Sequence, residues 1–184
     1  MFINLQGLSE FASPTKVKAY MQAKGFERLV LLEDFVWGGT QAAEVIPWVV
    51  TNLDIPVLFC PMLICPDGMR NLVALAAKTA GKLVVNPVIL LGDSAFISSH
   101  DKTDPVMNYI EQLILRLHPE IQGSVSGWNP PYSEHGYSQP GDTHTGATVV
   151  LFSNTPDNTI PLLHFHSAKS NWSPVFPRVS RETP

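Results

Sequence analysis

A short apolar segment that ends in two acidic residues and is followed by two glycines constrains the fold of this chain most. Residues 29–32 read Leu-Val-Leu-Leu, Glu33 and Asp34 follow at once, and Gly38-Gly39 come shortly afterwards. A continuous apolar run of this length is typical of a strand that is buried on both faces of a parallel sheet. The stretch after the glycines is compatible with a helix. The order of strand, turn and helix therefore predicts one unit of an open α/β sheet.

Further strand and helix candidates alternate along the chain. The expected helices cover residues 13–24, 41–53, 69–80 and 106–117, and the expected strands cover 29–32, 55–65, 82–91 and 147–152. Pro47 predicts a kink or the true start of the second helix. Pro56 and Pro61 argue against a central position for the whole of the second strand. The alternation favours an α/β fold with a mostly parallel sheet flanked by helices.

Residues 119–146 interrupt this alternation. The segment is rich in Gly, Pro, Ser, Asn and Tyr, and it predicts a long loop. Two interpretations stand side by side. The loop is either a plain surface excursion or a hood over a ligand pocket, in which Trp128, Tyr132 or Tyr137 offers a stacking face for a base.

Length and composition set the remaining limits. The 184 residues fit a single domain, 1–184, with a flexible tail at 179–184. A net charge of −4 with 15% charged residues leaves no electrostatic footprint for nucleic acid or an anionic membrane. No apolar run reaches the length of a membrane span. The low charge and slightly positive mean hydropathy favour either an interface, with a second copy or an operon-encoded protein, or a missing piece of sheet that would cover apolar surface.

The two cysteines indicate a reducing compartment. Cys60 and Cys65 lie in one apolar run at an odd spacing, which directs their side chains to opposite faces of a strand. A disulfide between them is therefore not expected. A cytoplasmic location is the simplest interpretation.

The acids and the glycine loop form the first candidate site. Open α/β sheets bind ligands at the carboxyl edge of their strands. There Glu33 and Asp34 would meet the backbone N–H groups of Gly38, Gly39, Thr40 and Gln41, which can point at an anion. The ordinary alternative is a pair of solvated acids at a strand end. Carboxylates beside an anion cradle suit a ligand that carries both ribose hydroxyls and a phosphate.

The segment from Glu33 to Gln41 resembles the signature of type I phosphoribosyltransferases, in which two acids after a hydrophobic strand precede a phosphate loop. Within that superfamily it is most similar to the PRTase-CE group, the phosphoribosyltransferase-like proteins of bacterial stress and conflict operons. Residues 153–163 and 172–178 also resemble this group. The resemblance implies a phosphoribosyl pyrophosphate or nucleotide ligand, Mg²⁺ as its companion, and an acceptor of unknown identity.

The resemblance also assigns roles to residues. Glu33 and Asp34 would be catalytic, holding the ribose and stabilising the positive charge that develops on its ring. Gly38, Gly39, Thr40 and Gln41 would hold the phosphate. A second polar wall of the pocket would come from Asn154, Thr155 and Asn158, whose ordinary interpretation is a simple turn.

Two departures from the family pattern bear on catalysis. Trp37 stands where the group usually has Gly, and Gly38 stands where a hydroxyl residue would bind the phosphate. The stretch before Leu29 is short, so we expect a minimal or N-terminally truncated member that lacks the strand carrying the pyrophosphate loop. These departures affect catalysis more than ligand binding.

Three hypotheses follow. The first is a phosphoribosyltransferase-like enzyme that uses Mg²⁺ and phosphoribosyl pyrophosphate. The second is a non-catalytic nucleotide- or sugar-phosphate-binding module of a bacterial stress or anti-phage system, with an operon-encoded partner. The third is a metal-binding or structural protein organised around His164 and His166, with His144 as the nearest further ligand. The chain has no Gly-x-Ser-x-Gly elbow and no Lys after its glycines, which excludes a serine hydrolase and a Walker-type NTPase.

Overall fold

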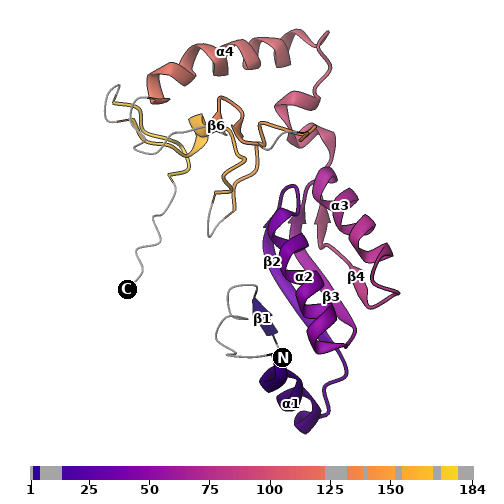
Figure 1. The fold of residues 1–184 in the computed structure, drawn as a ribbon. Coiled ribbons are helices and arrows are strands. Elements are labelled where there is room, and N and C mark those ends of the chain that lie inside the picture. Colours follow the sequence, from indigo (N-terminus) through magenta and orange to yellow (C-terminus); the bar gives the residue numbers. More distant parts are fainter. Residues whose placement is uncertain are drawn as a thin grey trace. The chain divides into compact units, whose positions relative to one another are not determined.

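The computed structural model describes residues 2–4, 14–122, 132–138, 141–151, 155–167 and 171–177. The chain divides into two compact units, residues 1–91 and residues 92–184 (Figure 1). Each unit is described by itself, and the expectation of a single domain over 1–184 stays a prediction. Trp128 and the tail at 179–184 lie outside the described residues.

The first unit is built on a parallel sheet. Its strands pair in the order β1-β2-β3-β4, with the short β5 also on β3, and every pairing is parallel. The strands are β1 (Phe2–Asn4), β2 (Leu29–Val36), β3 (Val57–Ile64), β4 (Leu83–Val85) and β5 (Ile89–Leu90). The helices that connect them are α1 (Pro14–Lys24), α2 (Thr40–Leu53) and α3 (Pro66–Ala77). The expected α/β fold with a mostly parallel sheet flanked by helices is therefore confirmed.

The helices pack on one face of this sheet. Leu31 of β2 and its partner Phe59 of β3 are fully buried, in one cluster with Ile46 of α2 and Leu72 of α3. Because the strand order follows the chain order, crossovers of one hand place successive helices on the same side. Most alternate residues are half-buried or exposed, as Leu32 shows with 42% of its surface accessible, but Val36 and Ile64 at the strand ends are buried.

Several element boundaries differ from the sequence-based expectation. β2 continues through both acids to Val36, because its pairing with β3 extends to Val36 beside Ile64. The expected strand at 82–91 is two short strands, β4 and β5. No pattern in the sequence indicated β1. Within the described residues, no helix is long and apolar enough to cross a membrane.

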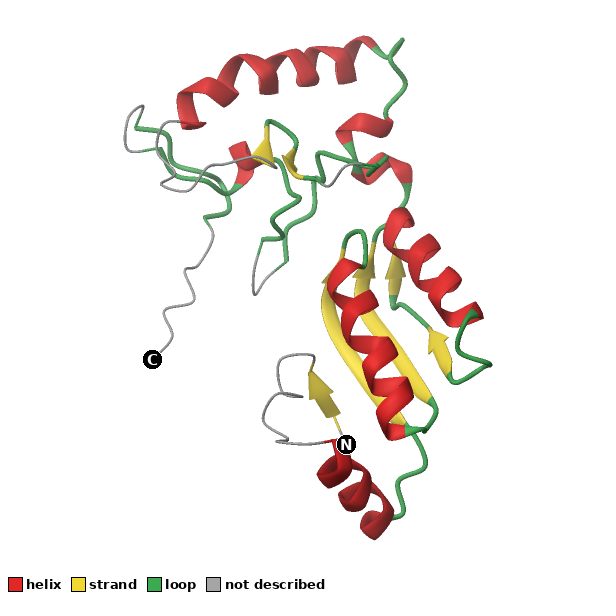
Figure 2. Cartoon of the chain, in the orientation of Figure 1, coloured by secondary structure: helices red, strands yellow, loops and turns green. Residues whose placement is uncertain are grey.

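The second unit centres on the helix α4 (Pro105–Gln122), with few strands beside it (Figure 2). Ile114 and Ile121 of α4 pack against Ile160 and Leu162, the latter in the 3₁₀ turn η4 (Pro161–Leu163). Two further 3₁₀ turns, η2 (Asp93–Ala95) and η3 (Ile97–Ser99), precede α4. A small antiparallel hairpin joins β6 (Tyr132–Ser133) to β7 (Gly136–Tyr137).

Two expectations for the second unit are wrong. The described part of the predicted strand 147–152, residues 147–151, is not a strand, and Ala147 makes only isolated bridges to Phe96 and Thr159. The predicted loop at 119–146 is not wholly a loop, since α4 continues to Gln122 and the hairpin lies within the segment. The prediction of this strand rested on apolar content alone. In the structure, single residues such as Ala147 are instead buried by tertiary packing.

Candidate functional site

The two acids lie inside β2, close to the carboxyl edge of the sheet. Glu33 and Asp34 are both half-buried. Adjacent strand residues point to opposite faces, so Glu33 shares the face of Leu31, and Asp34 shares the face of Leu32. The sequence-based hypothesis placed both carboxylates on one ligand. The strand instead directs them to opposite sides of the sheet.

Asp34 has one oxygen engaged by its own backbone. The N–H of Phe35 donates to Oδ1 of Asp34 at 2.9 Å. This bond orients the carboxylate at the sheet edge. Among the described residues no protein group bonds the second oxygen, so that oxygen is available to a ligand.

The glycine pair turns the chain from β2 into α2. Gly39 adopts the left-handed conformation, with φ 78° and ψ 14°, and stands at the N-cap of α2 without a side-chain cap. The first amides of a helix have no acceptor within the helix. The N–H groups of Thr40 and Gln41 therefore face the end of the helix, where the helix dipole favours an anion. Both residues are exposed.

The first turns of α3 support this loop from the side. Gly68 lies so close to the carbonyl oxygen of Trp37 that a β carbon there would approach it within 3.0 Å. Asn71 donates from Nδ2 to the carbonyl of Gly38 at 2.9 Å. A β carbon added to Gly39 would lie 3.4 Å from Cγ of Leu72. The shape of the loop thus depends on a neighbouring helix.

Sequence reasoning missed these supporting residues. Gly68 carried no signal for this contact, because the expected helix began one residue later, at Met69, and Gly68 read as part of the turn before it. Asn71 carried none, because its bond to Gly38 joins residues far apart in sequence. Trp37, noted only as a departure from the family pattern, is buried at the end of β2, with its ring 6.4 Å from that of Phe35.

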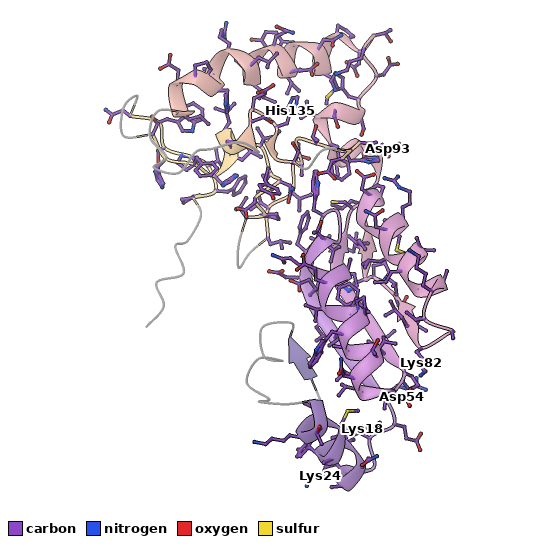
Figure 3. All side chains as sticks on the ribbon, in the orientation of Figure 1. Lys18, Lys24, Asp54, Lys82, Asp93 and His135 are labelled. Atoms are coloured by element: carbon purple, nitrogen blue, oxygen red, sulfur yellow. The ribbon has the colours of Figure 1, made fainter. Side chains whose placement is uncertain are left out.

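An ion pair lies at the opposite edge of the sheet, where β3 and β4 begin. Asp54, at the C-cap of α2, accepts from Lys82, as the labelled side chains in Figure 3 show. The hydrogen bond from Lys82, with the charges of Lys82 and Lys18, lowers the pKa of the Asp54 carboxyl below its ordinary 3.8. This acid is exposed and already paired, which makes it a suitable control for the acids of β2.

The expected second polar wall belongs to the other unit. Asn154 lies outside the described residues. Thr155 and Asn158 are buried, and Asn158 donates from Nδ2 to the carbonyl of Tyr137 at 2.6 Å. The N–H of Thr159 donates to the carbonyl of Pro156, which closes a turn. These contacts fasten the hairpin within the second unit, and a ligand role for the three residues stays a prediction.

The histidines of the third hypothesis have different surroundings. His164 is 1% exposed, and its Nε2 lies 3.2 Å from the carbonyl oxygen of Thr159. His166 is exposed. Among the residues that the structure describes, no group of three or more His, Cys, Asp or Glu side chains is placed to hold a metal ion.

The first unit thus combines a parallel sheet, an acid pair on its second strand and two glycines that lead into a helix without a side-chain cap. The model of the PRTase-CE family matches residues 1–178, and the chain belongs to this family. The resemblance read from Glu33 to Gln41 is thereby confirmed. Comparison with curated proteins and with solved structures found no match.

Proposed function

We propose that the chain binds phosphoribosyl pyrophosphate with Mg²⁺ at the carboxyl edge of β2 and transfers the phosphoribosyl group to an acceptor. The observation that carries this proposal is the glycine loop. Gly39 is held in a left-handed conformation, and α2 begins there without a side-chain cap. Such a helix start offers backbone N–H donors to a phosphate. The family membership supports the same ligand class.

The acids of β2 suit the cation and the sugar in different ways. Mg²⁺ is usually held by one or two carboxylates together with the phosphates of the substrate, and it keeps several waters. Bound Mg²⁺ would neutralise charge on the leaving group. Asp34 would contribute its second oxygen, and its negative charge would stabilise positive charge on the ribose ring.

A second candidate is a non-catalytic nucleotide- or sugar-phosphate-binding module of a bacterial stress or anti-phage system. One observation favours it. Because Glu33 and Asp34 alternate across β2, a single ribose meets one of them and not both in this conformation. Binding of the ligand would need only the glycine loop and one acid, whereas efficient transfer of the phosphoribosyl group would use both acids.

Calorimetric titration of phosphoribosyl pyrophosphate, with and without Mg²⁺, tests the proposal. We compare the wild type with Asp34→Asn and with the control Asp54→Asn, which removes an exposed acid at the other edge of the sheet. The expected result is binding that requires Mg²⁺, is weakened about tenfold or more by Asp34→Asn, and is unchanged by Asp54→Asn. No binding by a folded wild type, or equal loss in both variants, would contradict the proposal.

Release of pyrophosphate separates the two candidates. If the enzyme hypothesis holds, mixing the protein with phosphoribosyl pyrophosphate, Mg²⁺ and candidate bases or nucleosides releases pyrophosphate with at least one acceptor. Binding that is intact by calorimetry while no acceptor releases pyrophosphate would favour the binding module.

A further inference from the structure

Helices leave most of one face of the first unit's sheet uncovered, although Val36 and Ile64 at the carboxyl end of that face are buried. Leu32 of β2 is 42% exposed, Met62 of β3 is 58% exposed and Val84 of β4 is 55% exposed. The residues of the helix-covered face are nearly inaccessible, at 0% for Leu31 and 4% for Leu83. Parallel sheets are ordinarily buried on both faces, so an exposed apolar face in one needs an occupant.

The register brings the exposed side chains together. Leu58 of β3 lies beside Val30 of β2 and beside Val84 of β4, and Leu32 lies beside Cys60. Val30, Leu58 and Cys60 are half-buried. We call the set formed by Val30, Leu32, Leu58, Cys60, Met62 and Val84 the open sheet face. It crosses three neighbouring strands without an internal charge.

Charges of opposite sign stand at the two ends of this face along β2. Arg28 directly precedes the strand, and Asp34 is near its carboxyl end, each three residues from Leu31. The alternation of β2 places Asp34 on the side of Leu32, and the same alternation continued one residue before the strand would place Arg28 there too. Within the described part of the chain neither has an ion-pair partner, in contrast to Lys82, which pairs with Asp54.

The open sheet face, with Arg28 at one end and Asp34 at the other, is complementary to the same face of a second copy. A twofold axis that crosses the strands at the level of Leu31 turns a second copy so that its strands run antiparallel to the first. Arg28 of each copy then faces Asp34 of the other, and Leu32 of each meets Val30 of the other. Packed sheets lie about 10 Å apart, a distance that an arginine and an aspartate side chain can bridge together. A twofold interface joins a patch to itself in this way.

We propose that the open sheet face is the docking surface for a second copy of this chain, packed face to face with antiparallel strands. Apolar contacts between the two faces supply the attraction, and two Arg28–Asp34 pairs fix the register. Since the face spans only β2, β3 and β4, the dimer forms in a concentration-dependent way. This inference goes beyond the proposed function and shares Asp34 with it, but its readout is mass and not ligand binding, so either can fail without the other.

Sedimentation equilibrium over a range of protein concentrations provides the test. The full chain is expected to pass from 20.2 kDa towards twice that mass as its concentration rises. Leu32→Glu places a charge in the centre of the face and should leave the chain monomeric. The matched control is Val73→Glu, which places the same charge at a half-exposed valine of α3 and should associate as the wild type does. A wild type that stays at 20.2 kDa throughout would overturn the proposal.

A charge swap tests the register without disturbing the apolar surface. Arg28→Glu and Asp34→Lys alone should each weaken dimerisation about tenfold at low salt. The double variant should recover the association of the wild type, because the pairs form again with reversed sign. Circular dichroism confirms that each variant is folded. If the losses of dimerisation affinity in the two single variants simply added in the double variant, Arg28 and Asp34 would not meet across the interface, and this packing would be excluded.

Discussion

The backbone of Gly68 in α3 lies against the carbonyl oxygen of Trp37, so closely that a β carbon on Gly68 would come within 3.0 Å of that oxygen and would touch Val36 as well. This approach locks the start of α3 to the loop that leaves β2. The geometry of the glycine loop therefore depends on a residue that is not part of it.

Replacing Gly68 by alanine should destabilise the first unit. The added methyl group meets backbone and not the end of a flexible side chain, so α3 must move, and overpacking of this kind costs about 1–3 kcal/mol. Urea unfolding measures the loss. Gly92→Ala is the control, because a β carbon at Gly92 meets nothing within 4 Å and its φ of −88° suits alanine. Equal stability of the two variants would mean that the close approach is not present in solution.

Asn71 should matter for the loop more than for the fold. Its side chain donates to the carbonyl of Gly38. We expect Asn71→Ala to lose about 0.5–1.5 kcal/mol of unfolding free energy and to weaken binding of phosphoribosyl pyrophosphate. Asn86→Ala, an exposed asparagine without a side-chain bond in the described structure, should change neither quantity. If Asn71→Ala were destabilised but bound the ligand with unaltered affinity, the hydrogen bond from Asn71 to Gly38 would not contribute to ligand binding.

Asp104 should stabilise α4 as its N-cap. Its Oδ1 accepts from the N–H of Val106 at 2.8 Å and from the N–H of Met107 at 3.2 Å. Asp104→Ala is expected to cost about 1 kcal/mol in chemical unfolding. Asp104→Asn keeps the accepting oxygen and should recover most of that loss. An asparagine variant as unstable as the alanine variant would show that the charge, and not the bond, is what α4 requires.

The sequence predicted the strand and helix order of the first unit because local signals and tertiary structure agree there. Apolar runs mark β2 and β3, and glycines mark the turn after β2. The end of β2 was predicted too early, at Leu32, because acids usually stop a strand. Pairing of Phe35 with Leu63 and of Val36 with Ile64 carries the strand past them. That extension decides on which side of the sheet each acid lies.

The second unit was less predictable for a physical reason. Its core joins α4 to short turns, as in the packing of Ile114 and Ile121 on Ile160 and Leu162. Contacts of that kind have no period along the chain, so the run 147–152 looked like a strand. The isolated bridges of Ala147 to Phe96 and to Thr159 show how an apolar residue can be buried without a ladder.

Stability of the protein should fall as the pH drops below the ordinary histidine value of 6.5, and His118 should be one cause. His118 is buried on α4, and desolvation lowers its pKa, while the charge of Glu134 raises it and that of His135 lowers it. The unfolded chain thus binds the proton at a higher pH than the folded chain does. The contribution of His118 is constant above pH 6.5 and is lost as the pH falls from 6.5 through the folded pKa.

Urea unfolding of the wild type and of His118→Gln, at pH values above and below 6.5, measures this effect. Glutamine does not titrate, so the variant should lose less stability on acidification than the wild type, although its stability at neutral pH is lower because a buried ring has been removed. If His118→Gln and the wild type lost the same free energy on acidification, proton uptake by His118 would not contribute, and the acid sensitivity would belong to other groups of the second unit.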